Sequence, residues 1–255
     1  MRKLFVILIL LALLSVNQMQ CMDYTDKDDI KKDELLEMVI KNFEYDTCSS
    51  EQFATAISLV KAGANPNVTF MGESLLHKAL IFNNKDLVQV LLENNANYND
   101  TYFVTQQPIF FDAPTVEIAQ LFIDKGIDVN QVDGNGCNVL WHLIDHRFPV
   151  ELMRFYLKHK KYTVDVGHIC PWDGTCILHS FAANKDITKE DDFLSKVKLV
   201  LKVNPALVNM VDEKGETPII IAENTIKTWG EKYPLCVKTL KSFIDLCKEY
   251  QEKII

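Results

Sequence analysis

Apolar residues recur at helical spacing through most of the chain, in pairs of short segments that polar residues separate. The clearest pair lies between residues 72 and 99, where apolar positions fill residues 75–82 and 87–93 and a polar break covers 83–85. This pattern predicts two short helices followed by an extended exit at residues 95–99. Neither helix can bury its apolar face alone, so the unit needs neighbouring copies of itself.

Copies of this unit occur on both sides of it. Upstream, apolar spacing predicts one helix from residue 33 and a second over residues 53–60. The exits after the second helices carry asparagine at Asn67, Asn99 and Asn130, which lie 32 and 31 residues apart. A period of this length is typical of stacked helical repeats, so the chain is expected to be an all-α repeat protein.

Two stretches resemble the ankyrin-repeat signature G-x-T-P-L-H-x-A. Residues 72–79 read GESLLHKA, and residues 215–222 read GETPIIIA. Ser74 and Thr217 are placed to cap the helix that follows them. The resemblance implies an ankyrin-repeat solenoid of about six helix-turn-helix repeats with short hairpin loops. It also implies that the motif histidine, here His77 and His179, hydrogen-bonds to the backbone of a neighbouring loop.

The expected domain layout follows from these units. A signal peptide at 1–20 and a polar linker at 21–32 precede an ankyrin domain at 33–250, and 251–255 form a tail. The repeats are expected at roughly 33–67, 68–99, 100–130, 131–166, 167–209 and 210–250.

The middle repeats depart from the pattern. The third is two residues short between its helices and has Phe110 where the motif places histidine, and the fourth has Trp141 there. The fifth carries an insertion at 185–192 before its second helix. We therefore expect the function particular to this chain to reside in about residues 102–192.

The N-terminus has the layout of a secretory signal peptide. Arg2 and Lys3 precede thirteen mostly apolar residues, 4–16, and polar residues follow. The run is shorter than the ~20 residues of a membrane-spanning helix, so no transmembrane span is expected. The predicted location is secreted or periplasmic. Lipid attachment at Cys21 is a weaker alternative, because Gln20 precedes it where such sites want a small residue.

The composition limits the class of partner. The chain is 48% apolar, enough for a sizeable core, and its formal net charge is −8 without any run of basic residues. This argues against nucleic acid and anionic membranes as main partners and favours a partner protein with a basic surface. We expect a monomer without cofactor.

Candidate chemistry is sparse. We find no nucleophile motif and no phosphate-binding loop, so we do not expect an enzyme. The alternative is a metal protein or enzyme centred on His168, Cys170, Cys176 and His179, although their spacing fits no usual zinc rhythm. In an exported chain a Cys170–Cys176 disulfide is the preferred interpretation, with Cys137 as a competing partner of Cys176. His142 and an adjacent-turn histidine at position 146 lack a third metal ligand.

The resemblance implies a concave binding surface made of hairpin tips and first helices. Aromatic and acidic or amide residues at the tips are the expected partner contacts. These are Phe70, Met71, Tyr98, Asp100, Tyr102, Phe103, Asp128, Gln131, Asp133, Asp165, Trp172, Asp173, Asp212 and Glu213.

The leading hypothesis is an exported bacterial protein-interaction module. Bacterial export is inferred because the family is mostly intracellular in eukaryotes. A host-directed effector, a toxin-immunity-type inhibitor and a periplasmic accessory protein all stay open.

Overall fold

A computed structural model describes residues 32–41, 49–70, 72–102, 105–145, 147–159 and 162–254. The predicted signal peptide, almost all of the linker and Cys21 lie outside these residues, as do Met71, Phe103 and the side chain of Phe70. The chain divides into two compact units, Met1–Tyr98 and Asn99–Ile255, and each is described by itself.

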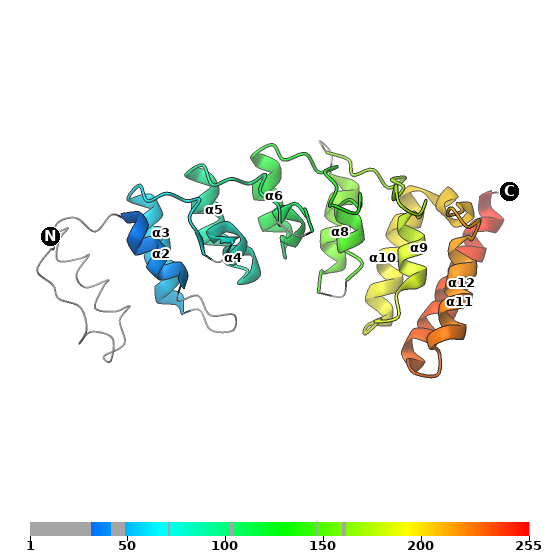
Figure 1. Cartoon of the computed structure of the whole chain (residues 1–255). Coiled ribbons are helices and arrows are strands. Elements are labelled where there is room, and N and C mark those ends of the chain that lie inside the picture. Colours follow the sequence, from blue (N-terminus) through cyan, green and yellow to red (C-terminus); the bar gives the residue numbers. More distant parts are fainter. Residues whose placement is uncertain are drawn as a thin grey trace, which may run out of the picture. The chain divides into compact units, whose positions relative to one another are not determined.

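The first unit contains two helix pairs (Figure 1). Its elements are α2 (Lys32–Lys41), α3 (Ser50–Lys61), β1 (Thr69–Phe70), β2 (Glu73–Ser74), α4 (Leu75–Ile81) and α5 (Lys85–Glu93). The two short strands are antiparallel and form a hairpin in front of α4. The predicted helices are confirmed to within three residues at their ends, with the largest difference at the start of α3.

Local sequence explains where these helices begin. Ser49 forms a capping box with Gln52, because the Ser49 hydroxyl accepts from the Gln52 amide while the Gln52 side chain accepts from the Ser49 amide. Ser74 caps α4 by accepting from the backbone N–H of His77, as predicted. The apolar face of α4, which includes Leu76 and Ala79, is buried.

The second unit continues the same alternation of helices. Its elements are η2 (Ile109–Asp112), α6 (Val116–Asp124), α7 (Val139–His142), α8 (Val150–Lys158), α9 (Ile177–Ala183), α10 (Glu190–Val203), η3 (Pro205–Asn209), α11 (Pro218–Trp229) and α12 (Pro234–Ile254). Thr217 caps α11, as predicted. The predicted tail at 251–255 needs correction, since α12 continues to Ile254 because its amphipathic pattern is uninterrupted.

The first helices of the irregular repeats are short. The third repeat has only the 3-10 turn η2, and α7 in the fourth repeat has four residues. Pro114 explains the first case, because a residue before proline is driven into extended backbone, and Ala113 has ψ 111°. Phe110, in the histidine position, is buried and packs edge-on against Phe111 with ring centroids 4.8 Å apart. Phe110 therefore packs in the hydrophobic core and does not replace the hydrogen bond of the motif histidine.

The exit asparagines join consecutive repeats. In the first unit, Asn67 Oδ1 accepts from the Asn97 amide at 2.7 Å. In the second unit, Asn130 Oδ1 accepts from the Asp165 amide at 2.8 Å and its Nδ2 donates to the Thr163 carbonyl at 3.2 Å. One side-chain amide thus satisfies backbone groups of the next exit, which explains why asparagine recurs there.

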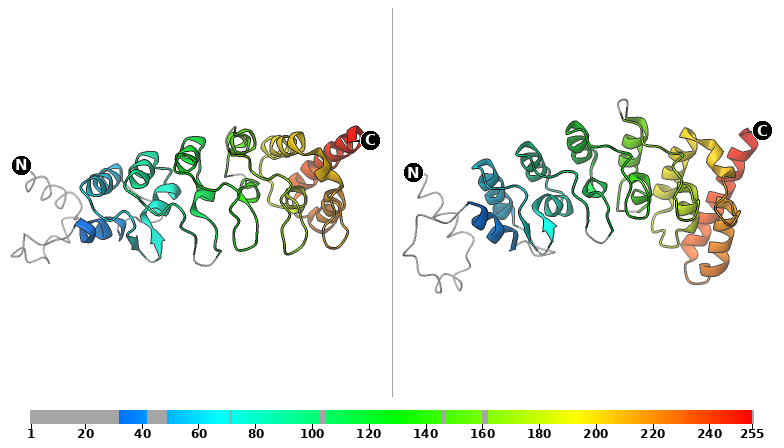
Figure 2. Two further views of the ribbon diagram at one scale, coloured as in Figure 1. Left: turned by 90° about the horizontal axis from the view of Figure 1, so that it is seen from above. Right: turned by 45° about the horizontal axis from the view of Figure 1, so that its top comes forward.

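Hairpins precede the first helices of the second unit. Isolated bridges join Val132 to Asn138 and Ile169 to Cys176, with Gly136 and Gly174 at positive φ in the turns. In the left view of Figure 2, the hairpins of this unit project from the side opposite α6, α8 and α10. Within the described part of the chain, no helix combines the length and apolarity needed to cross a membrane.

Candidate functional site

The hairpin tips of the second unit are tied to one another by hydrogen bonds. The Gly134 amide donates to the Thr105 carbonyl at 2.9 Å. His168 Nε2 lies 2.6 Å from the Gly136 carbonyl, and the Glu213 amide donates to the Asp173 carbonyl at 3.0 Å. The tips therefore form a connected row with fixed spacing.

The aspartates at three tips shape their own turns. Asp133 Oδ1 accepts from the Asn135 and Cys137 amides, both at 2.9 Å. Asp212 Oδ1 accepts in the same way from the amides two and four residues ahead, also at 2.9 Å. Asp173 Oδ1 accepts from the Thr175 amide at 3.0 Å and hydroxyl at 2.7 Å. The sequence analysis predicts these aspartates as partner contacts and does not predict their structural role. The spacing Asp-x-x-Gly at two of the tips is the signal that could have indicated it.

An acidic groove of about 450 Å³ lies between the tips that hold Asp173 and Asp212 and the helices α9 and α11. Its lining includes the carboxylates of Asp173, Asp212, Glu213 and Glu216, against the single cation of Lys214. Three of the four carboxylates belong to the predicted contact set, so the structure brings Asp173, Asp212 and Glu213 together. We call this feature the acidic groove.

His179 forms part of the lining of the acidic groove. Its Nδ1 accepts from the Cys176 amide at 3.0 Å, so in the neutral ring Nε2 carries the proton and donates to the Glu216 carbonyl at 3.0 Å. The side chain is buried. This is the contact to a neighbouring loop that the ankyrin resemblance implies for His179.

Asp173 carries its negative charge well below neutral pH. Partial burial acts to raise its pKa, but hydrogen bonds from the Thr175 hydroxyl and amide outweigh burial and leave the pKa below its ordinary value. The carboxylate therefore stays available to attract a cation.

Aromatic side chains lie at the margin of the acidic groove. Trp229, at the end of α11, is 39% exposed and belongs to the lining. Trp172 precedes Asp173 at the hairpin tip and is 72% exposed. Lys185 Nζ lies 6.0 Å from the centre of the Trp229 ring and 5.8 Å from that of Tyr233. A cation of the chain itself thus already sits over this aromatic pair.

Other predicted contacts lie outside the lining of the acidic groove. The Tyr102 hydroxyl donates to Asp112 at 2.5 Å, so its polar end is already used. Asp100 and Asp128 each accept from a backbone amide one or two residues ahead. Asp165 accepts likewise from Gly167. Gln131 and Tyr98 are half-buried.

The four residues of the metal alternative do not converge. His168 contacts the Gly136 carbonyl, and Cys170 Sγ lies 3.4 Å from the Asn135 carbonyl. Cys176 and His179 contact each other, with Sγ and Nδ1 3.1 Å apart. Among the residues that the structure describes, no group of three or more His, Cys, Asp or Glu side chains could hold a metal ion. His142 Nε2 lies 3.2 Å from Asp133, and position 146 lies outside the described residues.

The predicted Cys170–Cys176 disulfide is not formed in the structure, where both thiols are free. The reason lies in the side chains' directions. Cys176 is the N-cap residue of α9 and turns its sulfur into the core toward His179, whereas Cys170 turns toward the preceding hairpin. There Cys170 is hydrogen-bonded to Cys137, whose pKa rises to about 12, mainly because of burial and secondly because of Cys170.

Comparison with known proteins addresses the fold. Residues 71–100 match the family model described as the ankyrin repeat. No curated protein matches the chain. The ankyrin repeat domain of Bcl-3, titled a unique member of the IkappaB protein family, is similar over 73% of this chain and 76% of that one, with 19% identity and a TM-score of 0.55. The ankyrin repeat domain of human ASB11 is similar over 89% of this chain and 92% of that one, with 15% identity and a TM-score of 0.55. The predicted fold is thereby confirmed: the chain is an all-α ankyrin-repeat solenoid, and residues 71–100 hold a repeat that matches the family model.

Proposed function

We propose that the chain is a non-catalytic protein-interaction module whose acidic groove receives a lysine- or arginine-rich segment of a partner protein. The observation that carries this proposal is the grouping of four carboxylates around one lysine in a groove of about 450 Å³. Ankyrin-type stacks generally use such a surface to bind proteins. The expected partner has a basic surface, and the chain acts as a monomer.

The geometry of the acidic groove suits a cationic side chain. The carboxylates provide the attraction, which mainly accelerates association. Trp229 provides an aromatic face, and the position of Lys185 over Trp229 and Tyr233 illustrates how a partner's cation would pack there. Aromatic residues with adjacent charge are common anchors of protein interfaces.

A charge reversal that spares the turns tests the proposal. Glu213 is exposed and lines the groove, whereas Asp173 and Asp212 also hold their turns together. Glu213→Lys should lower the association rate of an arginine-rich peptide several-fold at low salt, measured by surface plasmon resonance. Glu223→Lys, an exposed residue of α11 outside the lining, is the matched control. Equal effects of both variants would contradict the assignment of the groove.

We further propose that the chain is exported and acts outside the cytoplasm, either as a host-directed effector or as a toxin-immunity-type inhibitor. The basis is the apolar segment of residues 4–16 behind Arg2 and Lys3. Sequencing the N-terminus of the protein recovered from culture supernatant and from periplasm tests the export. Co-purification with a protein of the same cell favours the immunity role, and recovery only with a host protein favours the effector role.

A further inference from the structure

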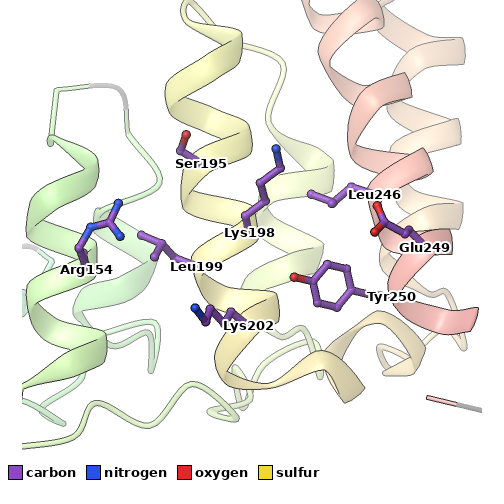
Figure 3. Close-up of a pocket in the computed structure, with 8 residues that line it drawn as sticks. All are labelled: Arg154, Ser195, Lys198, Leu199, Lys202, Leu246, Glu249 and Tyr250. Atoms are coloured by element: carbon purple, nitrogen blue, oxygen red, sulfur yellow. The ribbon is translucent and has the colours of Figure 1, made fainter. Parts of the chain in front are cut away.

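A second hollow, of about 510 Å³, lies in the second unit among the helices α8, α10 and α12 (Figure 3). Arg154 comes from α8, Lys198 and Lys202 come from α10, and Tyr250 comes from α12. We call this feature the basic groove. Its cations stand out in a chain whose formal net charge is −8.

Carboxylates are few among the residues that line the basic groove. Within the described part of the chain, no ion pair involves Arg154, Lys198 or Lys202. Glu249 is the one carboxylate of the lining, and Lys253 binds it at 2.6 Å. Lys253 chiefly, and Lys198 more weakly, lower the pKa of Glu249. The one carboxylate of the lining is thus already paired with Lys253.

The spacing of these cations matters. Lys198 and Lys202 are four residues apart on α10, so they lie on one face about 5–6 Å apart, where like charges repel. Arg154 comes from the adjacent helix, and neighbouring helix axes are about 8–10 Å apart. The positive charge therefore spreads over roughly 10 Å by these estimates, wider than a single phosphate group.

Hydroxyl groups add neutral donors to the basic groove. Ser195 lines the hollow one turn before Lys198, and the Tyr250 hydroxyl points toward α10 in Figure 3. The planar guanidinium of Arg154 can donate two parallel hydrogen bonds to one phosphate. Leu199 and Leu246 supply apolar lining for the body of a ligand.

From this arrangement we infer that the basic groove binds a small molecule that carries two or more phosphate groups. A second anionic group is needed because the cations come from two helices, α8 and α10, and are spread more widely than one phosphate group. A small ligand is favoured over a long polyanion because the acidic remainder of the protein repels an extended negative chain.

The test measures binding of pyrophosphate and inositol hexakisphosphate to the purified full-length protein by isothermal titration calorimetry. Inorganic phosphate and a hexaglutamate peptide are measured for comparison. We expect both polyphosphates to bind at least tenfold more tightly than inorganic phosphate. Lys198→Gln with Lys202→Gln should weaken that binding at least tenfold. The matched control is Lys227→Gln with Lys241→Gln, which removes the same charge from exposed positions of α11 and α12 outside the lining.

Three results would overturn the inference: no polyphosphate binding by the unmodified protein at millimolar concentration, equal weakening in the control variant, or tighter binding of hexaglutamate than of the polyphosphates. The last would assign the groove to acidic peptides instead. Circular dichroism of each variant confirms that it is folded. The inference does not depend on the acidic groove, because binding of an arginine-rich peptide is measured separately.

Discussion

The acidic and basic grooves of the second unit are built in different ways. In the acidic groove, Asp173 and Asp212 hold their own turns and His179 joins two repeats. In the basic groove, Arg154, Lys198 and Lys202 project from exposed helix faces and stabilise no turn. Substitution of Asp173, Asp212 or His179 therefore changes both folding and binding, whereas substitution of a cation in the basic groove changes binding alone.

The largest expected effect concerns His179. Replacing it by alanine leaves a cavity and removes partners from the buried Cys176 amide and the Glu216 carbonyl, so the free energy of unfolding should fall by about 3 kcal/mol. Urea denaturation followed by circular dichroism measures this. Ser180→Ala, at a half-buried neighbour that also lines the groove, should stay within ~0.5 kcal/mol. A change below ~1 kcal/mol for His179→Ala would contradict a joining role.

The fold could be predicted from sequence because each helix is indicated by apolar spacing and capping residues within its own repeat. The helix predicted over residues 75–82, for example, is α4 (Leu75–Ile81). One ion pair of the second unit could not be predicted in this way. Asp192 binds Lys196 at 2.9 Å across one helical turn, and Lys196 is fully buried and donates to the Asp145 carbonyl. The sequence does not indicate that a lysine on a helix will be buried and donate a hydrogen bond to a carbonyl far along the chain.

The two grooves were not equally predictable. Asp173 lies in one hairpin and Asp212 and Glu213 lie in the next, and a repeat stack places successive hairpins side by side. The basic groove was missed because Arg154, Lys198 and Tyr250 come from three helices and share no spacing. Only the packing of α10 against α8 and α12 brings them to one hollow.

The next effect separates folding from binding within the acidic groove. Asp212→Ala removes two hydrogen bonds from backbone amides to a carboxylate, so it should lower the free energy of unfolding by about 1–2 kcal/mol. The neighbouring Glu213→Ala should change it by less than ~0.5 kcal/mol while slowing association of an arginine-rich peptide. Thermal unfolding and surface plasmon resonance measure the two quantities. If Asp212→Ala leaves the free energy of unfolding unchanged, the Asp212 carboxylate does not stabilise its turn.

Alkaline pH probes the buried thiol of Cys247. Burial raises the pKa of Cys247, on α12, from 9.0 to about 12, with a smaller contribution from Cys176. Because the folded-state pKa lies above the unfolded one, its stabilising effect is complete below pH 9 and is lost as pH rises toward 12. Between pH 8 and 10 this thiol should account for a fall of about 1 kcal/mol in the free energy of unfolding.

Urea denaturation of the unmodified protein and of Cys247→Ala at both pH values isolates that contribution, since all other titrating groups are shared. The fall in the free energy of unfolding should be about 1 kcal/mol smaller in the variant, whatever its stability at pH 8. An identical fall in both proteins would mean that Cys247 titrates normally and is not held in the apolar interior.

The smallest expected effect on stability is the sharpest test of the comparison. Lys198→Gln with Lys202→Gln removes a repulsive pair of like charges on α10 and breaks no ion pair within the described residues. The free energy of unfolding should therefore stay within ~0.5 kcal/mol of the unmodified value or rise slightly, as read from urea denaturation at low salt. Any rise should disappear at high salt, because exposed charges are screened there. If the free energy of unfolding fell by more than ~1 kcal/mol, these lysines would support the fold as His179 does. The basic groove would then resemble the acidic groove, whose residues also stabilise the fold.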